Sequence, residues 1–197
     1  MRFILASSSP RRIELLKRFI PGLEVVKPIW ETRVISDDPV EVACLTALEK
    51  ARAVAGRFTE GLVIGADTIV VIDGEILGKP RDVSVARDYL RRLSGRVHRV
   101  ITGLAIIDAG SGKEVYDYEV TEVKFRELSD REIELYVSSG EPLDKAGAYG
   151  IQGFACLFVE WIRGDFYNVV GLPLFKLSLL LREFGVDLLE LAIGSGT

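Results

Sequence analysis

The sequence has almost none of the residues that build histidine- or cysteine-based sites. Its 197 residues include one histidine, His98, and two cysteines, Cys44 and Cys156, which form no CxxC motif. Zinc sites normally take several such ligands, so a zinc site is excluded in practice. Two isolated cysteines are typical of reduced, packed thiols in a cytoplasmic protein. We expect His98, near the start of a predicted strand, to be a structural hydrogen-bonding residue.

Side-chain amides are equally scarce. Asn168 is the only asparagine and Gln152 the only glutamine in the chain. Depletion of these heat-labile residues is a tendency of thermophilic proteins. The two amides that remain are therefore candidates for specific roles.

Long apolar runs and an excess of one charge are also missing. No run approaches the ~18 residues of a membrane span, and Phe3–Ala6 is far too short for a signal peptide. The 25 basic and 29 acidic residues give a net charge of −4. That balance argues against a nucleic-acid or membrane partner. Any site for an anionic ligand would need a local cluster of basic side chains. We expect a cytoplasmic protein.

The chain length and the order of the expected elements predict the fold class. We expect one domain over residues 1–197, because domains hold roughly 100–200 residues. Helix start signals precede Pro10 and Pro39, and Ser129 with Glu132 forms a capping box. Helices and strands alternate early and a long hairpin follows, which predicts an α/β fold with a mixed central sheet flanked by helices. The expected strands are 3–6, 23–27, 62–66 continued by 69–72, 75–80, 98–108, 114–125 and 156–162.

The segment from Ser7 to Arg12 is the first candidate binding site. It leads from a strand into a helix N-terminus, where unpaired backbone N–H groups and the helix dipole favour an anion. Hydroxyls of Ser7 and Ser9 add donors, and Arg11 and Arg12 add permanently charged ones. The alternative is a plain capped helix with solvated arginines.

Asp67 and Thr68 follow the apolar strand 62–66 directly and form the second candidate. Ligands of open α/β sheets lie at the carboxyl ends of strands. A carboxylate there suits metal binding or activation of a water molecule. The alternative is an ordinary turn aspartate.

The glycine-rich segment from Asp144 to Gly153 is the third candidate. Dense glycine lets a backbone approach a ligand closely, and Gln152 lies within the segment. An ordinary surface loop is the alternative. Separately, Lys50 falls at the edge of the apolar stripe of its predicted helix, which would bring its ammonium group out beside the core.

Taken together, these motifs resemble the Maf family of nucleotide pyrophosphatases, also called septum formation proteins. The resemblance covers nearly the whole chain and its motifs occur in the family's order. The matching segments are 7–12, 49–51, 65–68, 78–82, 93–95 with His98, 102–103, 144–153 and 168–173.

The resemblance implies an elongated, two-lobed, ITPase-like fold with a deep cleft, and dimers are common in the family. It implies hydrolysis of a nucleoside triphosphate between its α- and β-phosphates. The acid/base position falls on Asp67. The positions tied to base selectivity look like the UTP/dTTP branch rather than the 7-methyl-GTP branch. They are Arg12, Thr68 and Gln152, and Glu31, Lys50 and Lys79 match further cleft positions.

The chemistry of these residues is consistent with such a reaction. Attack on a phosphoanhydride needs charge neutralisation, a divalent metal and an oriented water. Arg12, Lys50 and Lys79 supply positive charge, while Glu31 and Asp67 are candidate ligands for Mg²⁺ or Mn²⁺. One of the two carboxylates would accept the proton of the water. The sequence does not show which one is the proton acceptor and which one only binds the metal. The family usually has two adjacent carboxylates near Glu31, whereas Trp30 occupies the first here.

Two other readings stay open at this stage. One is a nucleotide-binding regulator of cell division that does not turn over its ligand. The other keeps the enzyme and changes the substrate to a modified pyrimidine nucleotide or to 7-methyl-GTP. A homodimer is expected from the resemblance alone.

Overall fold

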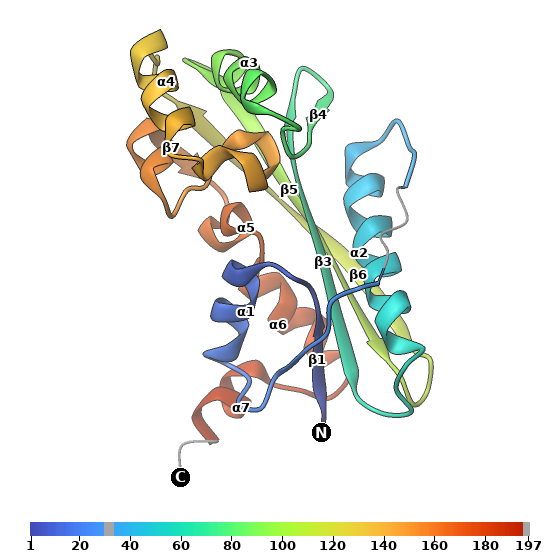
Figure 1. Ribbon diagram of the computed structural model, residues 1–197. Helices are drawn as coiled ribbons and strands as arrows, with labels where there is room; N and C mark the ends of the chain where they lie inside the picture. Colours follow the sequence, from blue (N-terminus) through green and yellow to red (C-terminus); the bar gives the residue numbers. More distant parts are fainter. Residues whose placement is uncertain (30–33, 195–197) are drawn as a thin grey trace. The chain divides into compact units, whose positions relative to one another are not determined.

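The computed structural model describes residues 1–29 and 34–194, and within them the strands form one mixed sheet. Seven strands are ordered β2-β1-β3-β5-β6-β7, with β4 paired to β3. Strand β1 pairs in parallel with β2 and β3, whereas β4 and β7 pair antiparallel with β3 and β6. The mixed sheet flanked by helices (Figure 1) confirms the expected fold class. The strands are β1 (Phe3–Ala6), β2 (Glu24–Val25), β3 (Leu62–Ile72), β4 (Glu75–Leu77), β5 (Val97–Asp108), β6 (Glu114–Phe125) and β7 (Val159–Arg163).

The helices begin where the sequence places its start signals. Ser9 and Asp38 are N-caps with proline at the first helical position, and the capping box of Ser129 with Glu132 is present. None of the helices in the described ranges is long and apolar enough to cross a lipid bilayer. The α-helices are α1 (Pro10–Lys17), α2 (Pro39–Ala55), α3 (Val83–Leu93), α4 (Asp130–Ser138), α5 (Phe166–Val170), α6 (Leu174–Arg182) and α7 (Leu188–Gly194).

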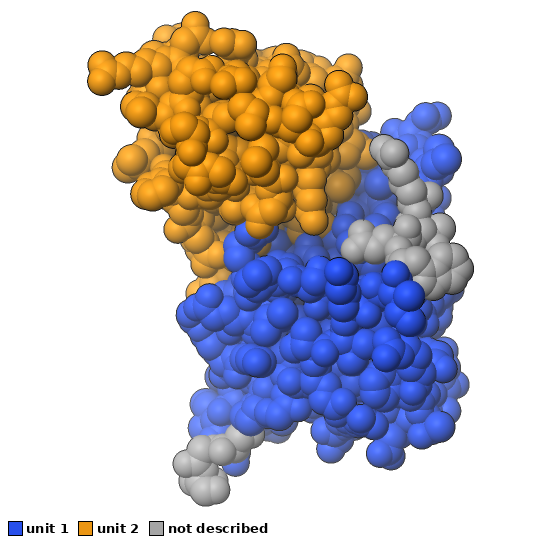
Figure 2. Space-filling view, viewed as in Figure 1, with its two compact units in different colours: residues 1–67, 102–119, 171–197 blue, residues 68–101, 120–170 orange. Residues whose placement is uncertain are grey.

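The chain divides into two compact units, coloured separately in Figure 2. Unit 1 comprises residues 1–67, 102–119 and 171–197, and unit 2 comprises residues 68–101 and 120–170. The prediction of a single two-lobed domain over residues 1–197, with its elongated shape and cleft, stays a prediction.

In unit 1, helix α2 covers one face of the sheet and α1 and α6 lie on the other (Figure 1). The face under α2 is made of small and branched apolar side chains. Gly65 of β3 allows an especially close approach, because a Cβ there would lie 2.3 Å from the carbonyl oxygen of Ala47. The buried cluster contains Ile4, Ala6, Ala47, Leu48, Ala51, Val54, Ala55, Val63, Ala105 and Ile107.

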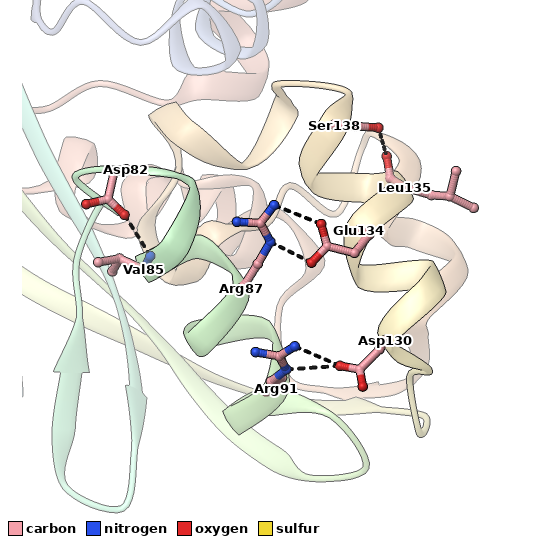
Figure 3. Close-up of polar contacts among 8 residues, drawn as sticks. All are labelled: Asp82, Val85, Arg87, Arg91, Asp130, Glu134, Leu135 and Ser138. Atoms are coloured by element: carbon pink, nitrogen blue, oxygen red, sulfur yellow. Dashed lines mark hydrogen bonds and ion pairs between the residues drawn. The ribbon is translucent and has the colours of Figure 1, made fainter.

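Unit 2 contains the β3–β4 hairpin and the helix pair α3 and α4. Asp73 and Gly74 both have positive φ, 53° and 81°, which is the conformation expected of an Asp-Gly hairpin turn. Arg87 and Arg91 of α3 form ion pairs with Glu134 and Asp130 of α4 (Figure 3). Because they are exposed, these pairs contribute little to the stability of the unit.

The scarce amide Asn168 is fully buried in unit 2. Its Nδ2 donates hydrogen bonds to the carbonyl oxygen of Val100, at 3.0 Å, and to Oγ1 of Thr121, at 2.9 Å. Since these partners belong to β5 and β6, one side chain joins α5 to two strands. Asn168 is therefore a structural residue of this unit.

The structure corrects the strand expected over 156–162. Residues Phe154–Phe158 form a short 3₁₀ helix, η3, and the strand β7 begins only at Val159. At its start the run does not alternate between apolar and polar residues. Pairing with β6 extends only from Val159 to Arg163. Two further 3₁₀ turns, η1 (Glu141–Asp144) and η2 (Ala146–Ala148), cover only the first part of the glycine-rich segment from Asp144 to Gly153.

Candidate functional site

An ion pair between Lys50 and Asp67 is the centre of the candidate site in unit 1. The Nζ atom of Lys50 donates to Oδ1 of Asp67 at 2.7 Å. Both side chains are largely buried, with 10% and 18% of their surface exposed. Such a pair keeps a carboxylate and an ammonium group in fixed positions next to solvent, which suits the binding and hydrolysis of an anion.

The register of strand and helix explains why these two residues meet. Residues two apart in a strand face the same side, so Asp67 follows Gly65 on the face that α2 covers. Lys50 lies about one helical turn after Ala47, the residue whose carbonyl oxygen is closest to Gly65. The sequence placed Lys50 at the edge of the apolar stripe, and the structure confirms that position.

The position of Asp67 along its strand corrects the sequence analysis. Asp67 and Thr68 lie inside β3, which runs unbroken from Leu62 to Ile72, and not after its end. Pairing with β1 stops at Gly65 and pairing with β4 starts at Val70, so the two residues lie between these registers. Asp67 therefore lies beyond the carboxyl end of the neighbouring strand β1 and not beyond the end of β3.

Arg12 has a contact that the sequence did not suggest. Its Nε donates to the carbonyl oxygen of Gly171 at 2.7 Å, and Nη1 donates to that of Ala66 at 2.9 Å. The guanidinium group thus connects α1 to the chain before α6 and to the residue preceding Asp67. Whether the same group also contacts a nucleotide, as the resemblance implies, stays a prediction.

The segment between β1 and α1 is held by a hydrogen bond between two of its serines. Ser7 is buried, and its Oγ accepts a hydrogen bond from the backbone N–H of Ser9 at 3.1 Å. Ser9 is the N-cap of α1, but its side chain makes no capping hydrogen bond. Arg11 is half-buried in the first turn. The roles of these residues toward phosphate stay predictions.

Unit 2 carries the other predicted binding residues. Thr68 is half-buried on β3, while Lys79 and Gln152 are exposed. The structure brings the segments of Lys79 and Gln152 together, because the N–H of Gly147 donates to the carbonyl oxygen of Gly78 at 3.1 Å. The segments that contain Lys79 and Gln152 are far apart in the sequence, but they are neighbours in unit 2.

The predicted metal ligands are only partly covered by the structure. Glu31, and Trp30 before it, lie outside the described residues. Among residues 1–29 and 34–194, no three histidine, cysteine, aspartate or glutamate side chains form a group suited to a metal ion. Asp67 is the predicted ligand whose surroundings are known.

A hydrogen-bonded pair near Gln152 was not predicted from the sequence. The hydroxyl group of Tyr136 donates to Oε1 of Glu141 at 2.9 Å, and the two side chains accept hydrogen bonds from the N–H groups of Gly150 and Phe154 respectively. The only signal for such a role was the position of Glu141 just before that segment. Side-chain partners this specific are not evident from spacing.

Comparison with known proteins gives full-length relatives. The family profile described as Maf-like protein matches residues 2–184. A protein of Thermococcus gammatolerans named dTTP/UTP pyrophosphatase is 56% identical over 95% of this chain and 98% of its own. One of the same name from Clostridioides difficile is 49% identical over 93% and 95%. Among solved structures, the Staphylococcus aureus Ham1 protein matches with a TM-score of 0.48 and 15% identity, covering 64% of this chain and 72% of that one.

Proposed function

Because the chain belongs to the Maf family, we propose that it hydrolyses dTTP and UTP to the nucleoside monophosphate and pyrophosphate. The observation that carries this proposal is the Lys50–Asp67 pair, because Asp67 is the residue to which the resemblance assigns the acid/base role. The relatives named dTTP/UTP pyrophosphatase align with this chain over nearly their whole length, which supports the same class of substrate.

Asp67 is the residue that we assign to the attacking water. Its Oδ1 accepts from Lys50, so the second oxygen, Oδ2, is the atom that orients the water and accepts its proton. General base catalysis of this kind typically contributes about 10²- to 10⁴-fold to a rate. Lys50 keeps the carboxylate in place and adds positive charge near the triphosphate.

The donor chemistry of Asp67 fits a divalent cation. Mg²⁺ usually takes one or two carboxylates, with water and substrate phosphate oxygens completing its octahedral shell. A carboxylate with 18% of its side-chain surface exposed suits that arrangement, and Glu31 is the second ligand that we propose. The bound cation would neutralise phosphate charge and polarise the scissile phosphate.

The first prediction concerns the products of the reaction. The purified protein with Mg²⁺ or Mn²⁺ should convert UTP to UMP and pyrophosphate, with loss of activity in EDTA. Product analysis over a panel of nucleoside triphosphates measures this outcome. Formation of UDP and orthophosphate would contradict cleavage between the α- and β-phosphates. Binding without turnover of any triphosphate would favour the division regulator, and preference for 7-methyl-GTP would favour the other branch.

Gln152 is the residue that we assign to recognition of the base. Uracil and thymine present an acceptor, O4, beside a donor, N3–H, and a carboxamide offers the complementary pair. Cytosine reverses both groups, so buried polar atoms would be mismatched, at a cost of about 1–3 kcal/mol. Arg12 and Thr68 complete the proposed base-selective set, while Ser7, Ser9, Arg11 and Lys79 are proposed phosphate contacts.

The second prediction tests this assignment with Gln152→Glu. A carboxylate cannot donate to O4, so the ratio of kcat/KM for UTP over CTP should fall by about 5- to 150-fold. Steady-state kinetics with both nucleotides measure the ratio. An equal loss on UTP and CTP would show that Gln152 only braces its own turn.

Three further properties of the protein stay predictions. They are the cytoplasmic location, the absence of nucleic-acid and membrane partners, and the homodimer.

A further inference from the structure

Gln152 lies in a tight turn of unit 2 whose ends are two glycines. The N–H of Gly153 donates to the carbonyl oxygen of Gly150 at 3.0 Å, which closes a four-residue turn. Ile151 is 7% exposed and anchors the turn in the core, whereas Gln152 next to it is exposed. The direction of the Gln152 side chain therefore depends on how firmly the turn is held.

Tyr136 and Glu141 hold the backbone on both sides of this turn. The N–H of Gly150 donates to the hydroxyl oxygen of Tyr136 at 3.3 Å, and that hydroxyl donates to Oε1 of Glu141 at 2.9 Å. The N–H of Phe154 donates to Oε2 of the same carboxylate at 3.1 Å. One tyrosine–glutamate pair thus bonds the first residue of the turn and the residue after the last.

Close packing makes this arrangement rigid. A Cβ at Gly153 would lie 2.2 Å from Oε1 and 2.4 Å from Oε2 of Glu141, so the carboxylate fills the space of a side chain. A Cβ at Gly150 would lie 2.6 Å from Cε of Lys145. The Nζ atom of Lys145 donates to the carbonyl oxygen of Glu141 at 2.7 Å. Neither glycine leaves room for the turn to shift toward these side chains.

The Tyr136 hydroxyl keeps its proton in this environment. Its side chain is 4% exposed, and its ring contacts Phe158 edge-on with centroids 5.1 Å apart. Burial, together with the hydrogen bond and the charge of Glu141, raises the pKa of Tyr136 above its ordinary value. The hydroxyl therefore both donates to Glu141 and accepts from Gly150.

We infer that Tyr136 and Glu141 are positioning residues that set base selectivity through Gln152. The inference rests on the proposed function and deepens it. Neither residue is assigned a contact with the nucleotide. Misplacement of a recognition group by about 1 Å is enough to lose much of its effect. Holding both flanks of the turn fixes the carboxamide before the base arrives, so that uracil or thymine meets matched donors and acceptors.

The test is Glu141→Gln, with Tyr136→Phe as a second variant that keeps the buried ring. A carboxamide at 141 offers one acceptor oxygen for two donors, and phenylalanine removes the hydroxyl that accepts from Gly150. In each variant the ratio of kcat/KM for UTP over CTP should fall at least fivefold. Dissociation constants of non-hydrolysable UTP and CTP analogues give the same ratio without turnover.

Glu134→Gln is the matched control. Glu134 is a carboxylate on α4, the helix of Tyr136, but it faces Arg87 of α3 and not the turn (Figure 3). Thermal unfolding of all variants reports folding. The control should retain the wild-type ratio even where the melting temperature falls, because loss of stability by itself affects UTP and CTP alike.

A double variant separates positioning from a general structural role. In the Gln152→Ala background, Glu141→Gln should lower the ratio no further. The inference is overturned if folded Glu141→Gln and Tyr136→Phe keep a UTP/CTP ratio within twofold of wild type. It is also overturned if Glu141→Gln lowers the ratio as much in the Gln152→Ala background as it does in the wild type. A wild-type protein that cleaves UTP and CTP alike overturns both base reading and this inference, while leaving the pyrophosphatase activity established by its products.

Discussion

Replacing Asp67 with asparagine is expected to lower kcat for UTP by about 10²- to 10⁴-fold. The substitution preserves size but removes the proton acceptor and one negative ligand of the proposed cation. Loss of metal binding would add to the effect, so raising the Mg²⁺ concentration should recover only part of the activity. Steady-state kinetics over a range of Mg²⁺ concentrations measure both contributions.

The same substitution should also reduce stability. Lys50 would lose the carboxylate partner of its ammonium group in a largely buried position, at an expected cost of about 1–3 kcal/mol in the free energy of unfolding. Urea denaturation measures this loss, and the kinetics must be recorded well below the midpoint. Folding itself should survive, because the helix–sheet packing around Gly65 is unchanged.

Asp73→Asn is the matched control for this experiment. Asp73 directly follows β3 and pairs with Arg96 in an exposed position, and asparagine tolerates its positive φ. The control should leave kcat within about twofold of wild type. If kcat of Asp67→Asn stays within about threefold, Asp67 is not the general base.

Much of the fold could be predicted because its signals are local. The caps at Ser9 and Asp38, the capping box at Ser129 and the turn at Asp73 each act within four residues. Such signals are written in adjacent residue types and need no knowledge of the rest of the chain. The starts of α1, α2 and α4 were therefore predicted correctly.

The errors arise where distant partners decide the structure. Asp67 was expected after a strand, yet β3 continues through it to Ile72 and pairs with β4 from Val70 onward. The apolar run from Phe154 forms a 3₁₀ helix, and helices α5 and α7 were not predicted at all. Short apolar segments carry little periodicity, so long-range pairing determines what they form.

The candidate site likewise combines a contact that follows from sequence periodicity with contacts that do not. The Lys50–Asp67 pair follows from helical and strand periodicity combined with one close contact at Gly65. The backbone partners of Arg12 and the Tyr136–Glu141 pair involve residues far apart or without a motif, so composition and spacing gave no sign of them. Resemblance to a family predicts which positions form the site, whereas the contacts show how those positions are held.

His98 provides the remaining prediction, a pH-dependent loss of stability. The ring is 2% exposed, its Nε2 lies 2.8 Å from the hydroxyl oxygen of Tyr149, and Phe125 and Tyr149 pack against it edge-on. Burial lowers the pKa of His98 from 6.5 to about 3. The contacts confirm the structural role expected for this residue, since one hydrogen bond and two aromatic rings enclose it.

The sign of the effect follows from proton binding in the two states. Between pH 6.5 and about 3 the unfolded chain carries a proton on His98 that the folded protein does not bind. The free energy of unfolding therefore falls as pH decreases through this window, by roughly 1.4 kcal/mol per pH unit and up to about 5 kcal/mol in total. Above pH 7 this contribution to the pH dependence disappears.

Urea unfolding of the wild type and of His98→Gln between pH 4 and pH 8 measures the effect. Glutamine retains a hydrogen-bonding group for Tyr149 but lacks the ring that packs against Phe125 and Tyr149, so we expect the variant to be less stable at pH 7. Glutamine does not titrate, so the stability of the variant should change less below pH 6.5. Carboxylates titrate in both proteins, and the difference between the two profiles therefore isolates His98. Parallel profiles would show that His98 already binds its proton in the folded protein, because only an equal proton uptake by both states removes the pH dependence.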